Sequence, residues 1–245
     1  MNDRPFVGWG APLVEARFRA RPNRFVVHAE VDGAEVVAHL ADPGRLRELL
    51  IPGARMGLRP ETPSATRKTA WTALLVETPD GNGWVSVNTT IPNRLIDVAL
   101  RAGALEEFDG WRYVRREVPW GASRLDFLME REGPAPGTAR LLYVEAKSVT
   151  LVEGGVALFP DAVTARGARH LEELIHVVEA GHAAAVLFVL QRPDAGRIVA
   201  ARHIDPVFSD TLARAEASGV RVLGRRCRVG WDGIELLGAV PAGAG

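Results

Sequence analysis

The sequence predicts an α/β (α+β) protein in which a small β-barrel is followed by a larger domain with a mixed sheet. Residues 13 to 88 hold about five short strand-like runs separated by Gly and Pro turns, whereas residues 89 to 245 alternate helical with strand patterns. A length of 245 residues with 47% hydrophobic content is sufficient for two packed units. We therefore expect a barrel at residues 1–88 and a second domain at residues 89–245.

The barrel is predicted from its alternating runs. Asp32-Gly33, a strong hairpin signal, separates two of them, and Asp80-Gly81 turns a later hairpin. The stretch Arg45–Leu50 has the pattern of one or two helical turns. Short strands with one small helix favour a barrel of the oligonucleotide/oligosaccharide-binding (OB) type. The strand-like runs are residues 13–20, 24–31, 34–40, a piece after Gly53, 72–77 and 83–88.

Four arginines interleaved with two phenylalanines mark the first strands of the barrel. OB-type barrels often hold single strands, to which these residues would offer charge and stacking. A solvated strand edge with its aromatic rings in the core fits the same pattern equally well. The residues are Arg17, Phe18, Arg19, Arg21, Arg24 and Phe25.

The second domain is predicted to run helix, strand, hairpin, helix, strand, helix, strand. Asn93 is expected to cap a first helix over residues 94–102. A second helix begins near Thr164, and Asp205, followed by proline, caps a third. The nearly continuous apolar run Ala183–Leu190 predicts a central strand that is buried on both faces. The other strands are expected at residues 113–118 and 220–223.

The hairpin between residues 123 and 147 carries the ionisable residues Asp126, Glu145 and Lys147. Because side chains alternate along a strand, Glu145 and Lys147 project from the same face. Folding about the Gly/Pro cluster at residues 133–137 pairs residues whose numbers sum to about 270, which sets Asp126 across from Glu145 or its neighbour. Two carboxylates and one ammonium are therefore expected to lie together.

This combination of charges is typical of metal-assisted phosphodiester hydrolysis. Two carboxylates within a few Å repel each other unless a cation lies between them, and their oxygen atoms suit Mg²⁺ or Mn²⁺. An ammonium beside them would position water and offset the charge that develops on the phosphate. An ordinary surface ion pair between Glu145 and Lys147 is the alternative interpretation.

The choice of lysine at position 147 favours the first interpretation. Of the 30 basic residues in the chain, only Lys68 and Lys147 are lysines, and the others are arginines. A chain that uses Arg almost everywhere else has Lys at 147, which indicates that a compact point charge is needed there.

Further polar residues flank this group in the sequence. Glu117 would add a third carboxylate to a metal, although Arg115 or Arg116 would serve as its ion-pair partner instead. Thr164, Arg166 and His170 stand at the start of the second predicted helix, where free backbone N–H groups and a guanidinium would clamp a phosphate. A capped helix with a solvated polar face is the alternative for these residues.

Composition limits the remaining classes. The formal net charge is zero, so no global basic field indicates nucleic acid, and the single cysteine, Cys227, excludes an intramolecular disulfide. We find no export signal and no apolar run of the roughly 20 residues that a membrane span needs. The expected location is the cytoplasm, with no membrane partner.

Several segments of the chain resemble the sugar fermentation stimulation protein A family. The resemblance extends from about residue 13 to residue 237, and the block Phe-Pro-Asp-Ala-Val-Thr is its most specific part. The matching segments are Asn88–Asn93, Ser123–Phe127, Val144–Leu151, Phe159–Gly167, His170-Leu171 and Ala201–Pro206.

The resemblance implies an OB-like barrel joined to a domain similar to PD-(D/E)XK nucleases, in a DNA-binding protein linked to the regulation of sugar-metabolism genes. The nuclease motif falls on Asp126, Glu145 and Lys147, with Glu117 as the upstream acid. Leu125 stands where the motif has a proline.

The sequence therefore predicts a DNA-binding protein with a nuclease-like, Mg²⁺- or Mn²⁺-dependent site. Asp126, Glu145 and Glu117 are the expected metal ligands, and Lys147 completes the catalytic set. A regulator that binds DNA without cutting it is the alternative, and a homodimer remains open. The expected nucleic-acid contacts are Arg17, Arg19, Arg24, Arg124, Thr164, Arg166 and His170.

Overall fold

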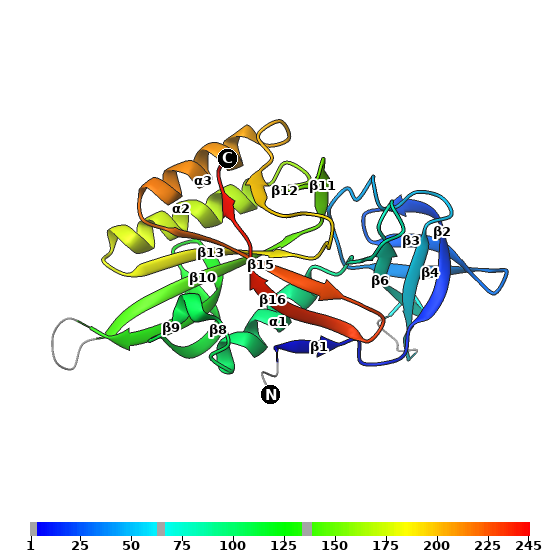
Figure 1. Ribbon diagram of the computed structural model, residues 1–245, viewed down its shortest axis with the longest axis horizontal. Helices are drawn as coiled ribbons and strands as arrows, with labels where there is room; N and C mark the ends of the chain where they lie inside the picture. Colours follow the sequence, from blue (N-terminus) through cyan, green and yellow to red (C-terminus); the bar gives the residue numbers. More distant parts are fainter. Residues whose placement is uncertain (1–3, 63–66, 134–138) are drawn as a thin grey trace.

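The computed structural model describes residues 4–62, 67–133 and 139–245. Its first unit is a closed barrel of five strands, at the right of Figure 1. Four antiparallel pairings place the strands in the order β4-β3-β2-β5-β6, and a parallel pairing of β4 with β6 closes the ring. The OB-like barrel is confirmed. Its strands are β2 (Val14–Asn23), β3 (Val26–Val31), β4 (Ala34–Leu40), β5 (Arg55–Pro60) and β6 (Trp71–Glu77), and β7 (Trp84–Ser86) extends the sheet beyond β6.

The sequence pattern accounts for most of the barrel. Phe18 points into the barrel core with 3% exposure, whereas the neighbouring arginines on β2 are exposed, as a period of two requires. Phe25, at the β2–β3 turn, is 52% exposed. The stretch Arg45–Leu50, expected to form one or two helical turns, forms a single turn in which the Leu50 N–H donates to the Leu46 carbonyl. Pro52 follows directly and stops any continuation.

The second unit is built on a seven-stranded mixed sheet, as predicted. The three central strands β10, β13 and β15 are parallel, and the outer strands pair antiparallel. A parallel centre covered on both faces explains the apolar run of β13. In spatial order the strands are β1 (Phe6–Gly8), β16 (Gly233–Ala239), β15 (Arg221–Val229), β13 (Ala183–Leu190), β10 (Ala139–Val149), β9 (Ser123–Glu132) and β8 (Arg112–Trp120).

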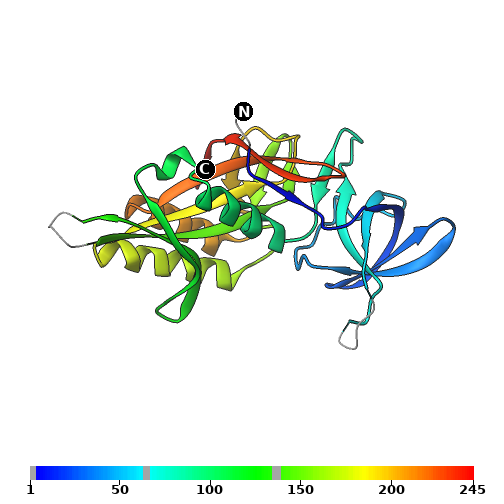
Figure 2. The same ribbon diagram turned by 90° about the horizontal axis from the view of Figure 1, so that it is seen from below.

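Helices cover both faces of this sheet (Figures 1 and 2). Helix α1 (Thr90–Arg101) packs on one face against alternate side chains of the strands, including Val144 and Ala146 of β10. Helices α2 (Ala165–Glu179) and α3 (Pro206–Ala217) pack on the opposite face. A 3₁₀ turn, η1 (Glu106–Phe108), connects α1 to β8.

A second, small sheet joins the end of β10 to the loop before α2. It was not predicted, because its strands have four residues or fewer and carry no clear period. Its strands are β11 (Leu151–Glu153), β12 (Val156–Phe159), β14 (Ile198–Ala200) and β17 (Ala242–Gly243).

The caps of the helices follow the sequence in two of three cases. Thr164 Oγ1 accepts from the Gly167 N–H at the start of α2, and Asp205 Oδ1 accepts from the Phe208 N–H at the start of α3. Helix α1 begins at Thr90 instead of Arg94, because proline is tolerated in a first turn and Asn88 accepts the Thr90 N–H. Asn93 is therefore not a cap.

The two units are in contact through polar and aromatic pairs. Trp84 of the barrel meets Trp231 of the second unit edge to face, with ring centroids 5.2 Å apart. The buried Arg192 guanidinium reaches Glu48 of the barrel at 3.5 Å. Strand β1 precedes the barrel in sequence but pairs with β16 in the second unit. The expected boundary at residue 88 thus separates β1 from the sheet to which it belongs.

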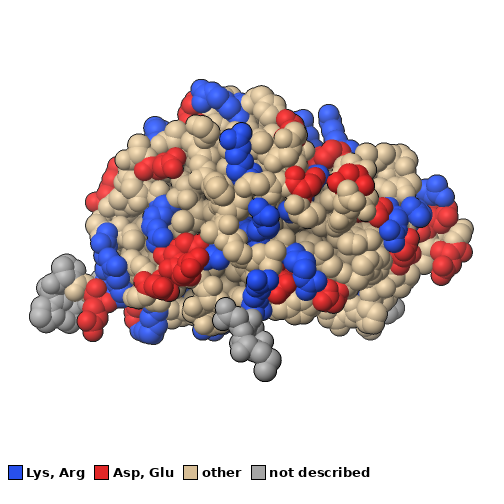
Figure 3. Space-filling view, viewed as in Figure 1, with Lys and Arg blue, Asp and Glu red and all other residues tan. Residues whose placement is uncertain are grey.

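The surface carries charges of both signs. Figure 3 shows basic and acidic side chains interspersed over one face, in keeping with a formal net charge of zero. No helix among the described residues combines the length and the apolar character needed to cross a bilayer.

Candidate active site

A cavity of about 780 Å³ lies where the barrel meets the second unit. The barrel contributes the end of β2 and the loop of residues 42–47, and the second unit contributes β9, β10 and the loop before α2. Six of the residues predicted to act in the site line this cavity. They are Arg24, Asp126, Glu145, Lys147, Thr164 and Arg166.

The hairpin register brings the two predicted carboxylates together. Strands β9 and β10 pair so that Val144 lies opposite Phe127, and the next step of this register sets Glu145 opposite Asp126. Asp126 Oδ2 accepts a hydrogen bond from the Ala146 N–H at 2.8 Å, across the two strands. The predicted turn at residues 133–137 lies, apart from Gly133, outside the described residues.

Glu145 is the centre of the site. Its carboxylate is almost completely buried, and Oε1 accepts from both Lys147 Nζ and His170 Nδ1, each at 2.5 Å. Burial raises the pKa of Glu145, but the charge of Lys147 and the contact with His170 outweigh it and hold the pKa below its usual value. Glu145 Oε2 is buried and has no hydrogen-bond partner among the described residues.

Asp126 is held at both oxygen atoms. Asn93 Nδ2 donates to Oδ1 at 2.8 Å, opposite the bond from the Ala146 N–H to Oδ2. Burial, together with the nearby charge of Glu145, raises the pKa of Asp126 to about 6. The two carboxylates thus lie close enough for one to disfavour ionisation of the other, which is the condition that a bound cation relieves.

His170 has a different place from the one predicted. Its side chain is buried, so it offers no surface for a nucleic-acid contact. Arg166 Nε donates to His170 Nε2 at 3.3 Å. Since Nε2 must accept this bond, the proton of the ring is on Nδ1, which donates to Glu145. His170 therefore orients the carboxylate of Glu145.

Thr164 and its loop are fixed by the next helix. The Thr164 N–H donates to Asp205 Oδ2 at 2.8 Å, and the other oxygen of Asp205 caps α3. The start of α2 consequently has one free backbone donor fewer than the sequence suggested. The predicted phosphate clamp reduces to the side chains of Thr164 and Arg166, both of which line the cavity.

Glu117 is not brought to the cavity. It lies on β8 with a backbone φ of +52° and an exposed side chain that pairs with Arg124 at 3.1 Å. Its partner is thus neither Arg115 nor Arg116. Among the described residues no cluster of three or more His, Cys, Asp or Glu is arranged to hold a metal ion, which leaves Asp126 and Glu145 as the acidic pair.

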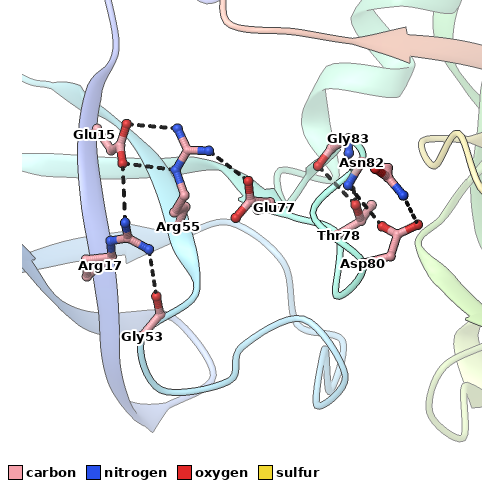
Figure 4. Close-up of polar contacts among 9 residues, drawn as sticks. All are labelled: Glu15, Arg17, Gly53, Arg55, Glu77, Thr78, Asp80, Asn82 and Gly83. Atoms are coloured by element: carbon pink, nitrogen blue, oxygen red, sulfur yellow. Dashed lines mark hydrogen bonds and ion pairs between the residues drawn. The ribbon is translucent and has the colours of Figure 1, made fainter.

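Two of the predicted barrel arginines also lie outside the cavity lining. Arg17 contacts Glu15 and the Gly53 carbonyl, next to an ion network in which Arg55 joins Glu15 to Glu77 (Figure 4). Arg19 pairs with Glu30. Strand β2 pairs with β3 on one side and β5 on the other, so these exposed arginines lie on the solvated outer face of the barrel and not on a strand edge.

Sequence reasoning missed four polar residues near the carboxylates. Asn93 was assigned to a cap, and Gln191, for which the sequence favoured a plain loop residue after the strand, is buried and donates to Ser148 Oγ at 2.5 Å. Asp42 and Asp161 hold the N–H groups of Gly44 and Arg45 on the barrel side. A side chain at position 44 would collide with Asp161, so this position requires glycine. The Asp-Pro-Gly at residues 42–44 was therefore the sequence pattern that could have pointed to this close contact between the two units.

In the absence of a metal ion, the free energy of unfolding should depend on pH through the ionisation of Asp126. Because its pKa is raised to about 6 in the folded state, the folded protein favours the protonated acid, and this stabilisation is lost as pH rises through 6. We expect Asp126→Asn, measured in EDTA by urea unfolding, to gain about 1.4 kcal/mol relative to wild type between pH 5 and pH 8. Asp109→Asn, at an exposed carboxylate, is the control. If the difference in unfolding free energy between Asp126→Asn and wild type were the same at pH 5 and pH 8, ionisation of Asp126 would not destabilise the folded protein.

Comparisons with known proteins cover nearly the whole chain. A family model described as "Sugar fermentation stimulation protein RE domain" matches residues 90–233, and one described as "SfsA N-terminal OB domain" matches residues 20–87. A sugar fermentation stimulation protein homolog from Moorella thermoacetica is 47% identical over 94% of this chain and 96% of its own length. The homolog from Chloroflexus aurantiacus is 44% identical over 95% of this chain and 86% of its own length.

A solved structure has the same fold. It is titled "The structure of Pyrococcus Furiosus SfsA in complex with Ca2+", and it superposes with a TM-score of 0.85 at 28% sequence identity. The match covers 98% of each chain, so it includes both the barrel and the mixed sheet.

Proposed function

Because the chain belongs to the sugar fermentation stimulation protein family, we propose that it binds DNA and hydrolyses phosphodiester bonds at Asp126, Glu145 and Lys147, with Mg²⁺ or Mn²⁺ as cofactor. The observation that carries this proposal is the buried carboxylate of Glu145, which lies beside a second carboxylate and a lysine in a cavity. Such a group is costly to bury for structure alone.

The residues present fit a divalent cation. Glu145 Oε2 is buried without a partner among the described residues, and burial together with the charge of Glu145 raises the pKa of Asp126, a cost that a bound cation would offset. Carboxylate oxygens are the donors that Mg²⁺ and Mn²⁺ prefer. The Pyrococcus furiosus relative is described as a complex with Ca²⁺, which supports a site for an oxygen-seeking cation in this family.

Asp126 and Glu145 would hold the cation, and Glu117 would join them only by releasing Arg124. A divalent cation there would polarise the phosphate and lower the pKa of a bound water. Lys147, with 11% side-chain exposure, would place an ammonium next to the phosphate oxygens and offset their growing charge. Asn93 and His170 would keep the two carboxylates in position.

The cavity also supplies groups that would hold DNA. Arg24 and Arg166 line it from opposite units, and the loop of residues 42–47 adds Arg45 and Arg47. Phosphates are repelled by uncompensated carboxylates. A protein that only binds DNA would gain nothing from two carboxylates in this cavity, which favours the hydrolytic function.

The test compares wild type with Glu145→Gln, which keeps the shape of the side chain and removes its charge. We expect Mn²⁺ binding, measured by calorimetry, and Mg²⁺-dependent cleavage of labelled DNA to be lost together, while DNA binding in EDTA is retained. Glu117→Gln is the companion variant. Cleavage by E117Q should stay near that of wild type, and a loss as large as that of E145Q would make Glu117 a third ligand.

The regulatory alternative gives a different result. DNA binding with no cleavage in Mg²⁺ or Mn²⁺, by wild type as well as by the variants, would replace the enzyme with a non-enzymatic regulator of sugar-metabolism genes. Cleavage that persists undiminished in E145Q would point to a contaminating nuclease and would reject this site.

A further inference from the structure

We propose that the cavity receives an unpaired segment of nucleic acid, with its bases against an apolar wall and its backbone toward Asp126, Glu145 and Lys147. This inference rests on the function proposed above and names the substrate class of that site. Its support comes from the chemistry of the two walls and from the size of the cavity.

One wall of the cavity is apolar. Leu151, Leu158, Phe159, Pro160 and Val163 all line it, in the same cavity as the acidic pair. Val163 is 72% exposed, more than any other large hydrophobic side chain among the described residues. Phosphate and sugar gain little from such a wall, but the face of a nucleobase does.

The wall is rigid. The Phe159 ring packs against Phe188 and against Phe208, with centroid distances of 5.5 and 5.1 Å. Asp205 fixes the other end of the same loop through the Thr164 N–H. Val163 therefore stands exposed on a fixed loop, where it offers a preorganised van der Waals contact to the face of a base.

The barrel wall is basic. Arg24, Arg45 and Arg47 are exposed and line the cavity, and their guanidinium groups make no hydrogen bond or ion pair with other described residues. Their backbone is held firmly, because the Arg21 guanidinium donates to the carbonyls of Asp42, Gly44 and Arg45. Guanidinium groups on a fixed backbone are well placed to bind the phosphates on either side of a base in the cavity.

The two walls together select a single strand. A duplex keeps its base faces stacked inside and presents only backbone and groove edges to a protein. An unpaired strand presents base faces on one side and phosphates on the other. The volume of about 780 Å³ falls within the range of about 300–1,000 Å³ typical of small-molecule sites, which is room for about one or two nucleotides of a strand.

The experiment measures binding and cleavage of three labelled DNAs of equal length: a single strand, a blunt duplex, and a duplex with a single-stranded overhang. Binding is followed by fluorescence anisotropy in Ca²⁺, and cleavage is followed in Mg²⁺. We expect the single strand to bind about tenfold more tightly than the blunt duplex. Cuts in the third DNA should fall in or beside its overhang.

Val163→Asn removes the apolar face without adding charge, and should weaken binding of the single strand about fivefold while leaving the blunt duplex unchanged. Val207→Asn is the matched control, because Val207 is 65% exposed and does not line the cavity. Arg47→Gln, on the barrel wall, should weaken single-strand binding and reduce its dependence on salt.

The outcomes separate the two proposals. Equal binding and cleavage of the blunt duplex and the single strand would overturn the single-strand assignment and leave the hydrolytic function in place. Tight single-strand binding without cleavage would overturn hydrolysis and keep the substrate class. A loss in V163N that is matched by V207N would reject the apolar wall as the cause.

Discussion

Replacement of Lys147 by methionine is expected to lower the rate of metal-dependent DNA cleavage by about 100-fold or more. Methionine matches the length and flexibility of the lysine stem but removes the ammonium that lies 2.5 Å from Glu145 Oε1. Single-turnover cleavage in Mg²⁺ measures the effect. DNA binding in Ca²⁺ should change little, because in the proposed complex the arginines that line the cavity would make most of the phosphate contacts.

Two controls accompany this variant. Lys68→Met removes the only other lysine in the chain, at an exposed position, and should leave cleavage unchanged. Lys147→Arg should not restore activity, because a planar guanidinium would bind the Glu145 carboxylate as a fork and could not act as a compact charge. Wild-type activity in K147M would remove Lys147 from the mechanism, and full activity in K147R would show that any positive charge suffices.

Replacement of Arg192 by methionine should lower the free energy of unfolding by about 3–5 kcal/mol. The Arg192 side chain is 3% exposed and binds Asp194 through two nitrogens, the Thr150 carbonyl at 3.1 Å, and Glu48 at 3.5 Å. Burial already raises the pKa of Glu48, against the opposing charge of Arg192. Without the guanidinium, the buried Thr150 carbonyl and the partly buried carboxylates of Glu48 and Asp194 would lose their donor.

The measurement is the free energy of unfolding in urea, compared between R192M and the control variant Arg202→Met. Arg202 also pairs with an aspartate, Asp210, but both side chains are more than half exposed, so its removal should cost less than about 1 kcal/mol. A single transition shifted to lower urea is the expected result. Similar losses in the two variants would show that burial adds nothing to the Arg192 network.

The sequence predicted best those features that depend on local periodicity. Alternation along β10 placed Glu145 and Lys147 on one face, and the register of a simple hairpin placed Asp126 opposite them. Capping residues with a following proline or an apolar face located α2 and α3. These signals work because backbone geometry within a few residues decides them.

Features decided by distant contacts were missed or misjudged. Asn93 looks like a helix cap, but α1 begins earlier at Thr90, which leaves the Asn93 amide free to bind Asp126. His170 stands among polar residues in the sequence, yet the packing of α2 on the sheet buries it against Glu145. By contrast, the pairing of Glu117 with Arg124 is local, since only seven residues separate them across the turn between β8 and β9, but only Arg115 and Arg116 were considered as partners in the sequence.

Strand β1 changes how the barrel is connected to the rest of the chain. Residues Phe6–Gly8 pair with β16 in the second unit, the following residues form the whole barrel, and the chain re-enters the second unit at helix α1. The barrel is therefore an insertion with two covalent tethers. Double tethering restricts rotation of one unit against the other, so the cavity between them should keep its shape better than one formed by two units joined at a single linker.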